Sequence, residues 1–405
     1  MKRFLVIGAG IAGCAAAAEL ARLGHRVLIL ESTGRAGGKA LSYACKATES
    51  CSRCGVCVAH SRISDALLHP RVSVMAGATV QKVEDVSQGC TVRGLFSNPQ
   101  VRHQECTGCG ACITACPGGA LSRYSRGGLR MVAIDYSSCL LHNGKKCSAC
   151  ADACSAGAIT TTSAPLGRFS IRADAVLIAT GHETFNPAVK PRLGYGRLRG
   201  VITGFDAEQV LSRQTWLPAA ANGHGDAAGV CPARSVAFIQ CVGSRDPSLN
   251  RNFCSSVCCA YALRMARLLK SLNHDTDVTV YYIDLQNFDK VFTPLRAELD
   301  GMGIRFVRGI PSSISRTAAG KLSLLIEDPE GQRTSAEHDA VVLATGIAPS
   351  EGAARLADLF GLEKDEFGFF RSERARVRVA GTCGEPQGIV ESIASARAAV
   401  LEMAR

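Results

Sequence analysis

Cysteine is the residue type that dominates the possible chemistry of this chain, and its spacing is regular. The segment Cys106–Cys116 has the pattern C-x2-C-x2-C-x3-C followed by Pro117, and a second cysteine-rich run follows it. Thiolates at this spacing hold cubane iron–sulfur clusters. A structural zinc site and a disulfide framework are the alternatives. Two interlocked four-cysteine runs, one of them ending in Cys-Pro, favour iron–sulfur clusters and therefore electron transfer.

The ligands of two clusters can be predicted from the rule for two-cluster ferredoxins. In those proteins the cysteine before the proline binds the cluster of the other run. The rule predicts a first cluster on Cys106, Cys109, Cys112 and Cys154. It predicts a second cluster on Cys139, Cys147, Cys150 and Cys116. The gap between Cys139 and Cys147 is longer than the ferredoxin pattern has, so the second set departs from that pattern.

Two further groups of cysteines have spacings that metals can use. The first group is Cys45, Cys51, Cys54 and Cys57. Its C-x2-C-x2-C core predicts another cluster, with a surface loop of incidental thiols or a redox pair as alternatives. The second group is Cys241, Cys254, Cys258 and Cys259. This group could form an iron–sulfur site, a zinc site or a redox-active disulfide. The N-terminus of the helix expected over 260–272 would favour the thiolate form of cysteines beside it.

The first 31 residues have the pattern of a dinucleotide-binding unit. Strands are expected at 4–7 and 27–30, with a glycine-rich turn and a helix over 11–23 between them. The first glycine makes the tight turn, the second lets a pyrophosphate approach, and the third lets helix and strand pack closely. The helix N-terminus faces the phosphates, and an acid after the second strand can bond ribose hydroxyls. The residues expected at the cofactor here are Gly8, Gly10, Ile11, Ala12, Gly13 and Glu31.

A lipoprotein signal is an alternative interpretation of the same N-terminus. Lys2-Arg3, the apolar stretch after them and Cys14 imitate such a signal. The spaced glycines, the helix that continues past Cys14 and the acid at Glu31 argue against processing. Cysteines at metal-ligand spacing in a large α/β-like chain favour a reducing cytoplasm. No apolar run reaches the length of a membrane span, so no direct membrane span is expected.

The net charge of +11 is weak support for an acidic partner. Each thiolate-bound cubane and each bound dinucleotide adds about two negative charges, which would offset most of the excess. Aromatic residues make up only 5% of the chain, and no basic stripe interleaved with aromatics is present. Nucleic-acid binding is therefore not expected.

Two similar motifs, DAVLIATG at 174–181 and DAVVLATG at 339–346, indicate two doubly wound units. In two-domain flavoproteins the first such strand closes the dinucleotide-binding half. The second unit lacks a GxGxxG turn after its expected first strand at 235–239, so a nicotinamide dinucleotide would lose close backbone approach there. A C-terminal helix is expected from about Ile389. In FAD reductases the N-terminus of the corresponding helix lies near the flavin, where negative charge develops on reduction. The other residues expected at the cofactor are Gly37, Gly38, Ala179, Thr180, Gly181, Gly381 and Ile389.

We therefore expect an α/β fold with two doubly wound dinucleotide-binding-type domains and an inserted α+β two-cluster ferredoxin domain. The expected segments are 1–100 for the first part of the FAD-binding domain, 101–163 for the insert, 164–230 for the second FAD-binding part and connection, 231–346 for the second Rossmann-like domain, and 347–405 for the C-terminal FAD-binding part. With 405 residues the chain is long enough for this organisation.

These motifs together resemble the heterodisulfide reductase A-subunit family over nearly the whole chain. The most specific of them is Cys241-Val-Gly-Ser-Arg-Asp with its Cys-x3-Cys-Cys. The resemblance implies a thioredoxin-reductase-type FAD domain, usually dimeric, with 4Fe-4S clusters that relay electrons to B- and C-type partner subunits. It implies that Cys241, Cys254, Cys258 and Cys259 bind a cluster near the flavin. The chain lacks the C-terminal ferredoxin module and the N-terminal extension of methanogen members, and is more similar to short bacterial forms from sulfur-oxidising and quinone-interacting complexes.

The expected function is that of an FAD- and iron–sulfur-containing electron-transfer subunit in cytoplasmic sulfur metabolism. The sequence does not single out any side chain as a general acid or general base in catalysis. One alternative is a stand-alone NAD(P)H or thiol–disulfide oxidoreductase, which would need a nicotinamide fingerprint after Ile239 or a C-x2-C disulfide at the flavin. Another is a scaffold whose clusters are only structural.

Overall fold

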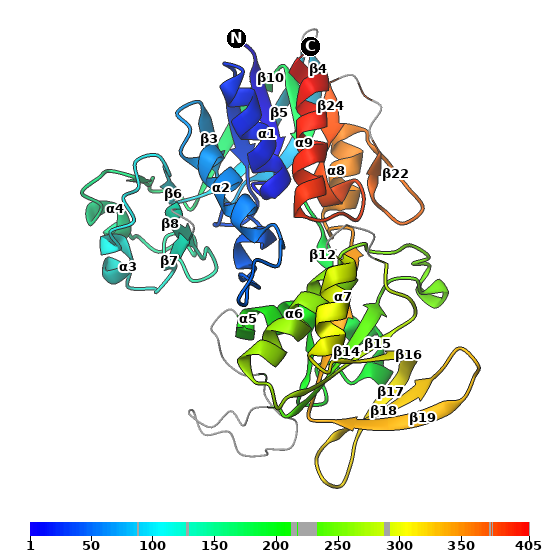
Figure 1. Cartoon of the computed structure of the whole chain (residues 1–405). Coiled ribbons are helices and arrows are strands. Elements are labelled where there is room, and N and C mark those ends of the chain that lie inside the picture. The colour runs from blue at the N-terminus through cyan, green and yellow to red at the C-terminus, as the bar shows by residue number, and fades with distance from the viewer. Residues whose placement is uncertain are drawn as a thin grey trace. The chain divides into compact units, whose positions relative to one another are not determined.

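The computed structural model describes residues 1–86, 89–126, 129–211, 217, 233–286, 292–371, 374 and 376–404. These residues form two compact units, whose elements can be followed by colour and label in Figure 1. Unit 1 comprises Met1–Ser42, Gly55–His182 and Pro349–Arg405, and unit 2 comprises Tyr43–Cys54 and Glu183–Ala348. Trp216, which the sequence predicts to pack in an interface, lies outside the described residues.

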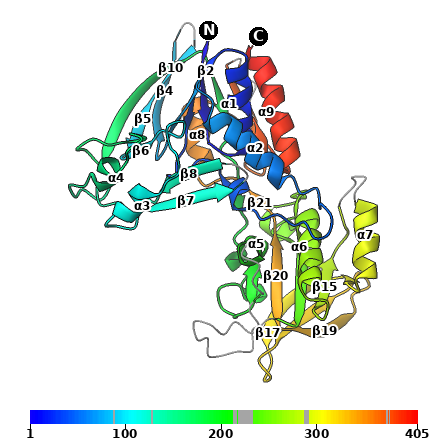
Figure 2. The same ribbon diagram turned by 60° about the vertical axis from the view of Figure 1, so that its left-hand side comes forward.

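Unit 1 is organised around a parallel sheet. Its strands, in spatial order, are β24 (Val377–Val379), β11 (Ala175–Ile178), β1 (Arg3–Ile7), β2 (Arg26–Leu30) and β3 (Val72–Met75). The strands are nearly continuous apolar runs because both faces of the sheet are covered. One face packs against α1 (Ile11–Arg22), α2 (Val56–Leu67) and α9 (Ile389–Ala404). Figures 1 and 2 show α1 and α9 side by side.

The other face of this sheet packs against a second layer of strands and a helix. The antiparallel strands are β10 (Leu166–Ala173), β5 (Gly89–Ser97) and β4 (Thr79–Val86), and the helix is α8 (Ala353–Phe360). Side chains of β1 point alternately to the two faces of the sheet. Val6 packs in the core with α1, α2 and α9, and Leu5 packs in the core with the antiparallel strands and α8. A short hairpin of β22 (Glu363–Lys364) and β23 (Phe370–Arg371) follows α8.

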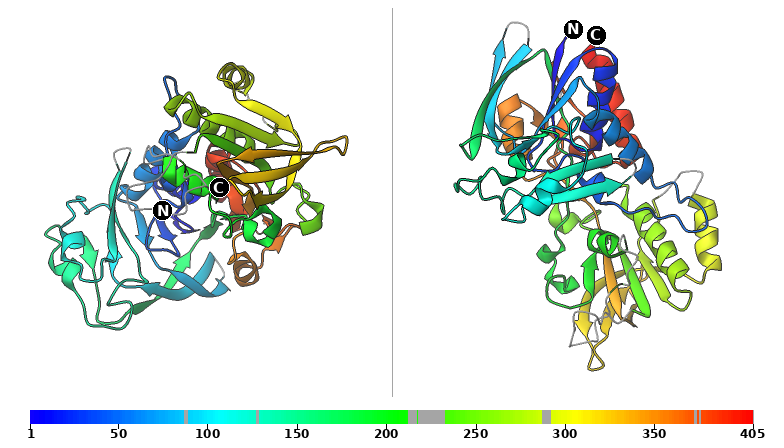
Figure 3. Two further views of the ribbon diagram at one scale, coloured as in Figure 1. Left: turned by 90° about the horizontal axis from the view of Figure 1, so that it is seen from below. Right: turned by 90° about the vertical axis from the view of Figure 1, so that its left-hand side faces the viewer.

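The cysteine-rich insert is a small α+β element within unit 1. It opens with β6 (Gln100–Val101) and closes with β9 (Ile159–Thr160), and these two strands pair with each other. Between them lie α3 (Ala111–Ala115), the hairpin β7 (Leu121–Arg126) and β8 (Leu129–Ile134), and α4 (Ala149–Asp152). The hairpin is seen most clearly in Figures 2 and 3. Its small core includes Cys112, Cys139 and Cys150 among apolar side chains.

The insert is fastened to the rest of unit 1 by its hairpin. Met131 is fully buried in the same core as α1, α2 and α9. The backbone N–H of Ile134 donates to the carbonyl of Gly34 at 3.0 Å. The Tyr124 hydroxyl lies 3.1 Å from Nε2 of His60 on α2. These contacts give the insert a defined position against the dinucleotide-type sheet of its own unit.

Unit 2 repeats the layer plan of unit 1. Its parallel strands, in spatial order, are β13 (Val201–Thr203), β20 (Ala340–Thr345), β14 (Ser235–Val242), β15 (Asp277–Tyr282) and β16 (Arg305–Arg308). One face packs against α5 (Gly204–Leu211), α6 (Cys258–Leu272) and α7 (Phe292–Gly301). The antiparallel strands β17 (Ile310–Arg316), β18 (Leu322–Glu327) and β19 (Arg333–His338) cover the other face. A two-residue pairing joins β12 (Glu183–Thr184) to β21 (Ile347–Ala348).

The docking of the insert depends on Gly34 having no side chain. A Cβ atom there would lie 1.8 Å from the carbonyl oxygen of Ile134, so the backbone must move. Gly34→Ala should lower the free energy of unfolding by about 1–3 kcal/mol, the usual cost of overpacking. Urea unfolding, followed by the far-UV circular dichroism signal, measures this change. Gly352→Ala is the control, because its Cβ would meet no atom within 4 Å. Equal midpoints for the two variants would mean that the Gly34–Ile134 contact is not kept in solution.

Candidate metal centres and dinucleotide cradle

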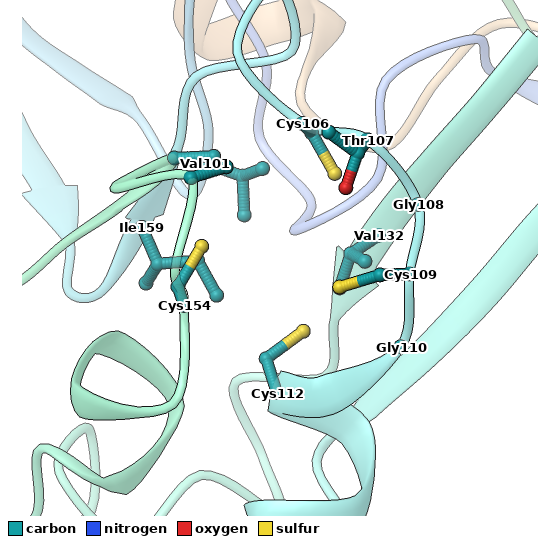
Figure 4. Close-up of a pocket in the computed structure, with 12 residues that line it drawn as sticks. Val101, Cys106, Thr107, Gly108, Cys109, Gly110, Cys112, Val132, Cys154 and Ile159 are labelled. Atoms are coloured by element: carbon teal, nitrogen blue, oxygen red, sulfur yellow. The ribbon is translucent and has the colours of Figure 1, made fainter.

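Four cysteines of the insert face one common pocket. Figure 4 shows the sulfur atoms of Cys106, Cys109, Cys112 and Cys154 directed into the same space. Three come from the loop before α3 and from α3 itself, and the fourth follows α4. Apolar side chains of Val101, Val132 and Ile159 complete the lining. The loop can turn this sharply because Gly108 and Gly110 have positive φ angles of 68° and 89°.

The chemistry of this pocket fits a thiolate-bound metal cluster. Burial raises the pKa of the Cys112 thiol, and the charges of Cys106, Cys154 and Cys109 raise it further. A backbone N–H from Ala111 lowers the pKa of Cys109. Buried thiolates this close repel one another, and bound iron relieves that repulsion by replacing the protons.

The other four cysteines of the insert form a second group. Burial raises the pKa of Cys150 to about 11, and the charges of Cys139, Cys147 and Cys116 act in the same direction. Cys116 therefore lies with the later run, while Cys154 lies with the earlier one. This is the crossed arrangement that the ferredoxin rule predicts. The structure thus brings together both predicted sets, although their roles as ligands stay a prediction.

No set of three His, Cys, Asp or Glu side chains among the described residues has the arrangement of a single-ion site. Each thiolate of a cubane binds a different iron, so its ligands are spread more widely than the ligands of one zinc ion. The four cysteines in Figure 4 face a shared space in this way.

A third thiol group lies in unit 2 at the carboxyl end of β14. Its members are Cys241, Cys254, Cys258 and Cys259. Burial raises the pKa of Cys241 to about 12, and the charges of Cys259 and Cys254 add to this. A hydrogen bond from Cys258 lowers the pKa of Cys259 to about 7, despite burial. Cys259, Cys241 and Cys254 all raise the pKa of Cys258, so the four side chains of the predicted group lie close together. Cys258 and Cys259 are the first two residues of α6.

The backbone at Cys241 is adapted to this position. Cys241 has a positive φ of 59°, and the pairing of β14 with β20 shifts between Ile239 and Val242. The strand therefore gains an extra residue where a dinucleotide-binding unit would have its glycine turn. Such an outlier marks a position where the surrounding structure holds the backbone against its preference.

The loop that carries Cys254 is held by polar contacts. Arg251 donates through Nε to the carbonyl of Gly243 at 2.6 Å and through Nη2 to that of Ile347 at 2.5 Å. Its guanidinium also lies over the rings of Phe185 and Phe253. The Ser255 hydroxyl lies 2.6 Å from that of Ser244. Sequence reasoning missed Arg251 and Ser255, because both also bond the backbone of Ile347, which lies 96 and 92 residues later in the chain.

The fourth predicted group is divided between the two units. Cys45, Cys51 and Cys54 belong to unit 2, and Cys57 belongs to unit 1. The segment Tyr43–Cys54 is attached to unit 2 by buried charges. The Lys46 ammonium pairs with the Glu208 carboxylate, and both side chains are almost fully buried. Arg267 donates to Oγ1 of Thr48 at 2.6 Å.

The glycine turn of unit 1 has the close packing that the sequence predicts. A Cβ at Gly8 would lie 2.4 Å from the carbonyl oxygen of Ala179, and one at Gly13 would lie 2.0 Å from that of Gly8. These two glycines therefore permit close packing of turn, helix and strand. A Cβ at Gly10 would meet nothing within 4 Å. The space before the N-terminus of α1, which begins at Ile11 and Ala12, is open to an anion such as a pyrophosphate.

Glu31 and the following loop are fastened to this turn. The Glu31 carboxylate accepts hydrogen bonds from the backbone of Ala9 at 2.9 Å and of Thr33 at 2.8 Å. The N–H of Gly37 donates to the carbonyl of Ala9 at 2.7 Å. A Cβ at Gly38 would lie 2.9 Å from Cα of Gly10. The predicted ribose acid and the Gly37-Gly38 loop therefore lie at the mouth of the glycine turn.

The ends of β11 and β24 form another wall of the cradle. Gly181 and Gly381 both have positive φ angles, and a Cβ at Gly381 would lie 2.6 Å from that of Ala12. The buried thiol of Cys383 interacts with both the hydroxyl and the backbone of Thr180, which fixes this end of β11. Ile389 begins α9 beside this wall.

His182 completes the wall and was not predicted. Its Nδ1 lies 2.9 Å from the Thr382 hydroxyl, and its carbonyl accepts a hydrogen bond from Lys39 at 2.7 Å. Burial, with the nearby Lys39 charge, lowers the pKa of His182 to about 3. The imidazole is therefore neutral at ordinary pH. Its position directly after Ala179-Thr180-Gly181 is the only sequence feature that points to it.

Comparisons with known proteins agree with this geometry. A family model for NAD(P)-binding Rossmann-like domains matches residues 6–63, and a model for 4Fe-4S dicluster domains matches residues 105–158. The second match confirms the predicted two-cluster ferredoxin insert. No helix among the described residues is both long and apolar enough to cross a membrane.

Relatives of known name match nearly the whole chain. It is 30% identical, over 99% of its length, to the A-type subunit of H(2):CoB-CoM heterodisulfide,ferredoxin reductase from Methanothermobacter marburgensis, and covers 63% of that protein. It is also 30% identical, over 98% of its length, to the A-type iron-sulfur subunit of CoB–CoM heterodisulfide reductase from Methanocaldococcus jannaschii, again covering 63%. The chain thus spans less than two thirds of the length of these relatives.

Solved structures of thioredoxin reductases share the fold. The enzyme of T. acidophilum matches with a TM-score of 0.54 at 16% identity, covering 100% of this chain and 98% of that one. The enzyme of Lactococcus lactis matches with a TM-score of 0.55 at 14% identity, with the same coverage. The predicted fold class, a thioredoxin-reductase-like pair of doubly wound domains with an inserted ferredoxin domain, is confirmed.

Two glycine substitutions should separate cofactor binding from folding. Gly10→Val adds a side chain to open space, so the apoprotein should unfold like the wild type while FAD binds at least about tenfold more weakly. Gly13→Val should instead lower the free energy of unfolding by about 1–3 kcal/mol or more, because it collides with the Gly8 carbonyl. Fluorescence titration with FAD and thermal unfolding of the apoprotein measure the two effects. Unchanged FAD affinity in Gly10→Val would show that the pyrophosphate does not lie at this turn.

Proposed function

This chain is a homologue of the A-type subunits of heterodisulfide reductases, and from that relationship we propose that it is an FAD- and iron–sulfur-containing electron-transfer subunit of a heterodisulfide-reductase-like complex in sulfur metabolism. The main support is that two four-cysteine groups occupy an insert fastened to the same unit as the dinucleotide cradle. A structural scaffold would not need two metal-type pockets beside an open nucleotide cradle.

In this proposal the cradle of unit 1 binds FAD. Gly8, Gly10 and Gly13 admit the pyrophosphate at the N-terminus of α1. Glu31, held by Ala9 and Thr33, receives the ribose hydroxyls. The N-terminus of α9, which begins at Ile389, would offer its positive dipole end to negative charge on the reduced flavin. FAD supplies two-electron exchange when bound, whereas each cubane passes one electron, so the pair suits a converter between the two.

The insert hairpin sets the distance between the clusters and the cradle. Tyr124 and His60 join β7 to α2, and Met131 inserts from β8 into the core beneath α1. These residues hold the insert in place without taking part in the redox chemistry. Because burial and the nearby Lys39 charge lower its pKa, His182 stays neutral and adds no positive charge at the end of β11.

The ligand sets are proposed as follows. The insert binds one 4Fe-4S cluster through Cys106, Cys109, Cys112 and Cys154, and a second through Cys116, Cys139, Cys147 and Cys150. A further cluster binds in unit 2 through Cys241, Cys254, Cys258 and Cys259. A cluster on Cys45, Cys51, Cys54 and Cys57 stays a prediction.

The proposed partners are B- and C-type subunits, with a homodimer as the form of this chain and the cytoplasm as its location. The relatives' names describe them as subunits, which supports a multi-subunit complex. Co-purification from the native host would identify these partners.

The crossed ligand sets can be tested by additivity of iron loss. Cys116→Ser and Cys139→Ser should each remove one cluster, about four irons per chain, and the double variant should lose no more. Cys116→Ser combined with Cys109→Ser should lose about eight irons, because the two cysteines bind different clusters. Iron and acid-labile sulfide analysis of anaerobically prepared protein measures this, with Cys90→Ala, a buried cysteine among apolar side chains, as the control. Loss of both clusters in the Cys116/Cys139 double variant would contradict the assignment.

The main alternative, a stand-alone NAD(P)H oxidoreductase, makes a different prediction. The carboxyl end of β14 carries Cys241 where a dinucleotide-binding unit has its glycines, so unit 2 should not bind a nicotinamide dinucleotide. Anaerobic holoprotein should therefore be bleached by dithionite in the flavin and iron–sulfur bands and remain unchanged with excess NADH or NADPH. Rapid bleaching by either nucleotide would favour the alternative. A colourless anaerobic preparation containing no iron would contradict both.

A further inference from the structure

Gln240 is a buried amide whose polar atoms have no partner. Its side chain is 1% exposed, and neither Nε2 nor Oε1 makes a hydrogen bond to any described residue. Leaving such a group unsatisfied costs about 1–3 kcal/mol. Nearly all buried polar groups in folded proteins are satisfied, so this one requires an explanation.

The position of Gln240 in β14 places it on the side of the third thiol group. Phe238 belongs to the core under α6, and Ile239 belongs to the core on the opposite face of the sheet. Because side chains alternate along a strand, Gln240 lies on the same face as Phe238. Cys258 belongs to that same core and opens α6, and Cys241 directly follows Gln240.

The extra residue in β14 is consistent with this orientation. Ile239 and Val242 both belong to the core opposite α6, although two residues separate them instead of one. The additional position is taken by Cys241 with its positive φ. Gln240 therefore keeps the regular alternation, and the irregularity begins after it.

An apolar residue would be the expected occupant of this position. Val236 and Phe238 precede Gln240 on the same face, and both are buried among Leu263, Ala266 and other apolar side chains. The neutral amide offers two N–H donors and no charge. Acceptors of the right kind are the thiolates of the third group and the sulfides of a cluster bound to them.

We infer that Gln240 is a positioning residue for the cluster at Cys241, Cys254, Cys258 and Cys259, and that its amide N–H donates a hydrogen bond to a sulfur of that centre. This inference rests on the proposed cluster in unit 2. Hydrogen bonds to cluster sulfurs stabilise the reduced state, which carries more negative charge, and so raise the reduction potential. Gln240 makes this centre easier to reduce than an apolar pocket would.

The test replaces the amide with an apolar side chain of similar length. Gln240→Met should keep the iron content and fold about as stably as the wild type, because a buried apolar side chain of similar size leaves no polar group without a partner. The cluster should become about tenfold harder to reduce, which corresponds to about 59 mV for one electron. Redox titration followed by EPR measures this shift. Ile239→Val, an equally buried change on the opposite face, should leave the potential unchanged.

The signal of the unit 2 centre is identified first by Cys259→Ser, which should remove it. If Cys259→Ser loses neither iron nor any EPR signal, the proposed cluster itself is wrong. If the signal is lost there but Gln240→Met titrates at the wild-type potential, the cluster stands and the role of Gln240 is wrong. Loss of iron in Gln240→Met would likewise overturn the inference, because it would show a structural role.

A second measurement uses wild-type protein, so it still tests the inference if Gln240→Met fails to fold. Wild-type holoprotein labelled with a magnetic isotope at glutamine side-chain nitrogens should show a hyperfine coupling to the reduced unit 2 cluster. Its absence in pulsed EPR spectra would overturn the inference. Its presence in wild-type protein and disappearance in Gln240→Met would support it.

Discussion

Several thiolates can share a small buried space only when cations hold them there. Cys112 is surrounded by the charges of Cys106, Cys109 and Cys154, and Cys150 by those of Cys116, Cys139 and Cys147. Without metal this repulsion is relieved by protons, as the raised pKa values of Cys112 and Cys150 indicate. Three of these cysteines, Cys112, Cys139 and Cys150, are themselves buried in the apolar cluster of the insert. Metal binding and folding of the insert are therefore linked, and the position of the insert on β8, Gly34 and Met131 depends on both.

The two units use one layer plan for different chemistry. In unit 1 the turn after the first strand is built from glycines, which lets a cofactor approach the backbone. In unit 2 the equivalent position is the carboxyl end of β14, where Cys241 has a strained backbone conformation and Arg251 and Ser255 hold the loop that follows. The carboxyl end of a parallel sheet is the usual ligand position in such folds. A thiol group in unit 2 therefore lies at the end of the sheet where folds of this type usually bind ligands.

Local patterns in the sequence were enough to predict the fold class and the residues of the cradle. Gly8, Gly10 and Gly13 have separate roles because strand, turn and helix are adjacent in the chain, and the crossed positions of Cys116 and Cys154 follow from the spacing of the ferredoxin pattern. Contacts between distant segments could not be predicted in this way. Glu208 meets Lys46 across 162 residues, and the hydroxyl of Thr382 meets His182 across 200. Gln240 looks like an ordinary strand residue until its burial without partners is known.

The segment Tyr43–Cys54 has a consequence for dissecting the protein. The polypeptide leaves unit 1 after Ser42, contributes this segment to unit 2 and returns at Gly55 before the main part of unit 2 is reached. A fragment made only of residues 183–348 would lack Lys46 and would leave the buried Glu208 carboxylate unpaired. Breaking such a pair costs about 3–5 kcal/mol, a large share of the stability of a domain. Each of the two units is therefore built from separate segments of the chain, and neither can be produced as one continuous fragment.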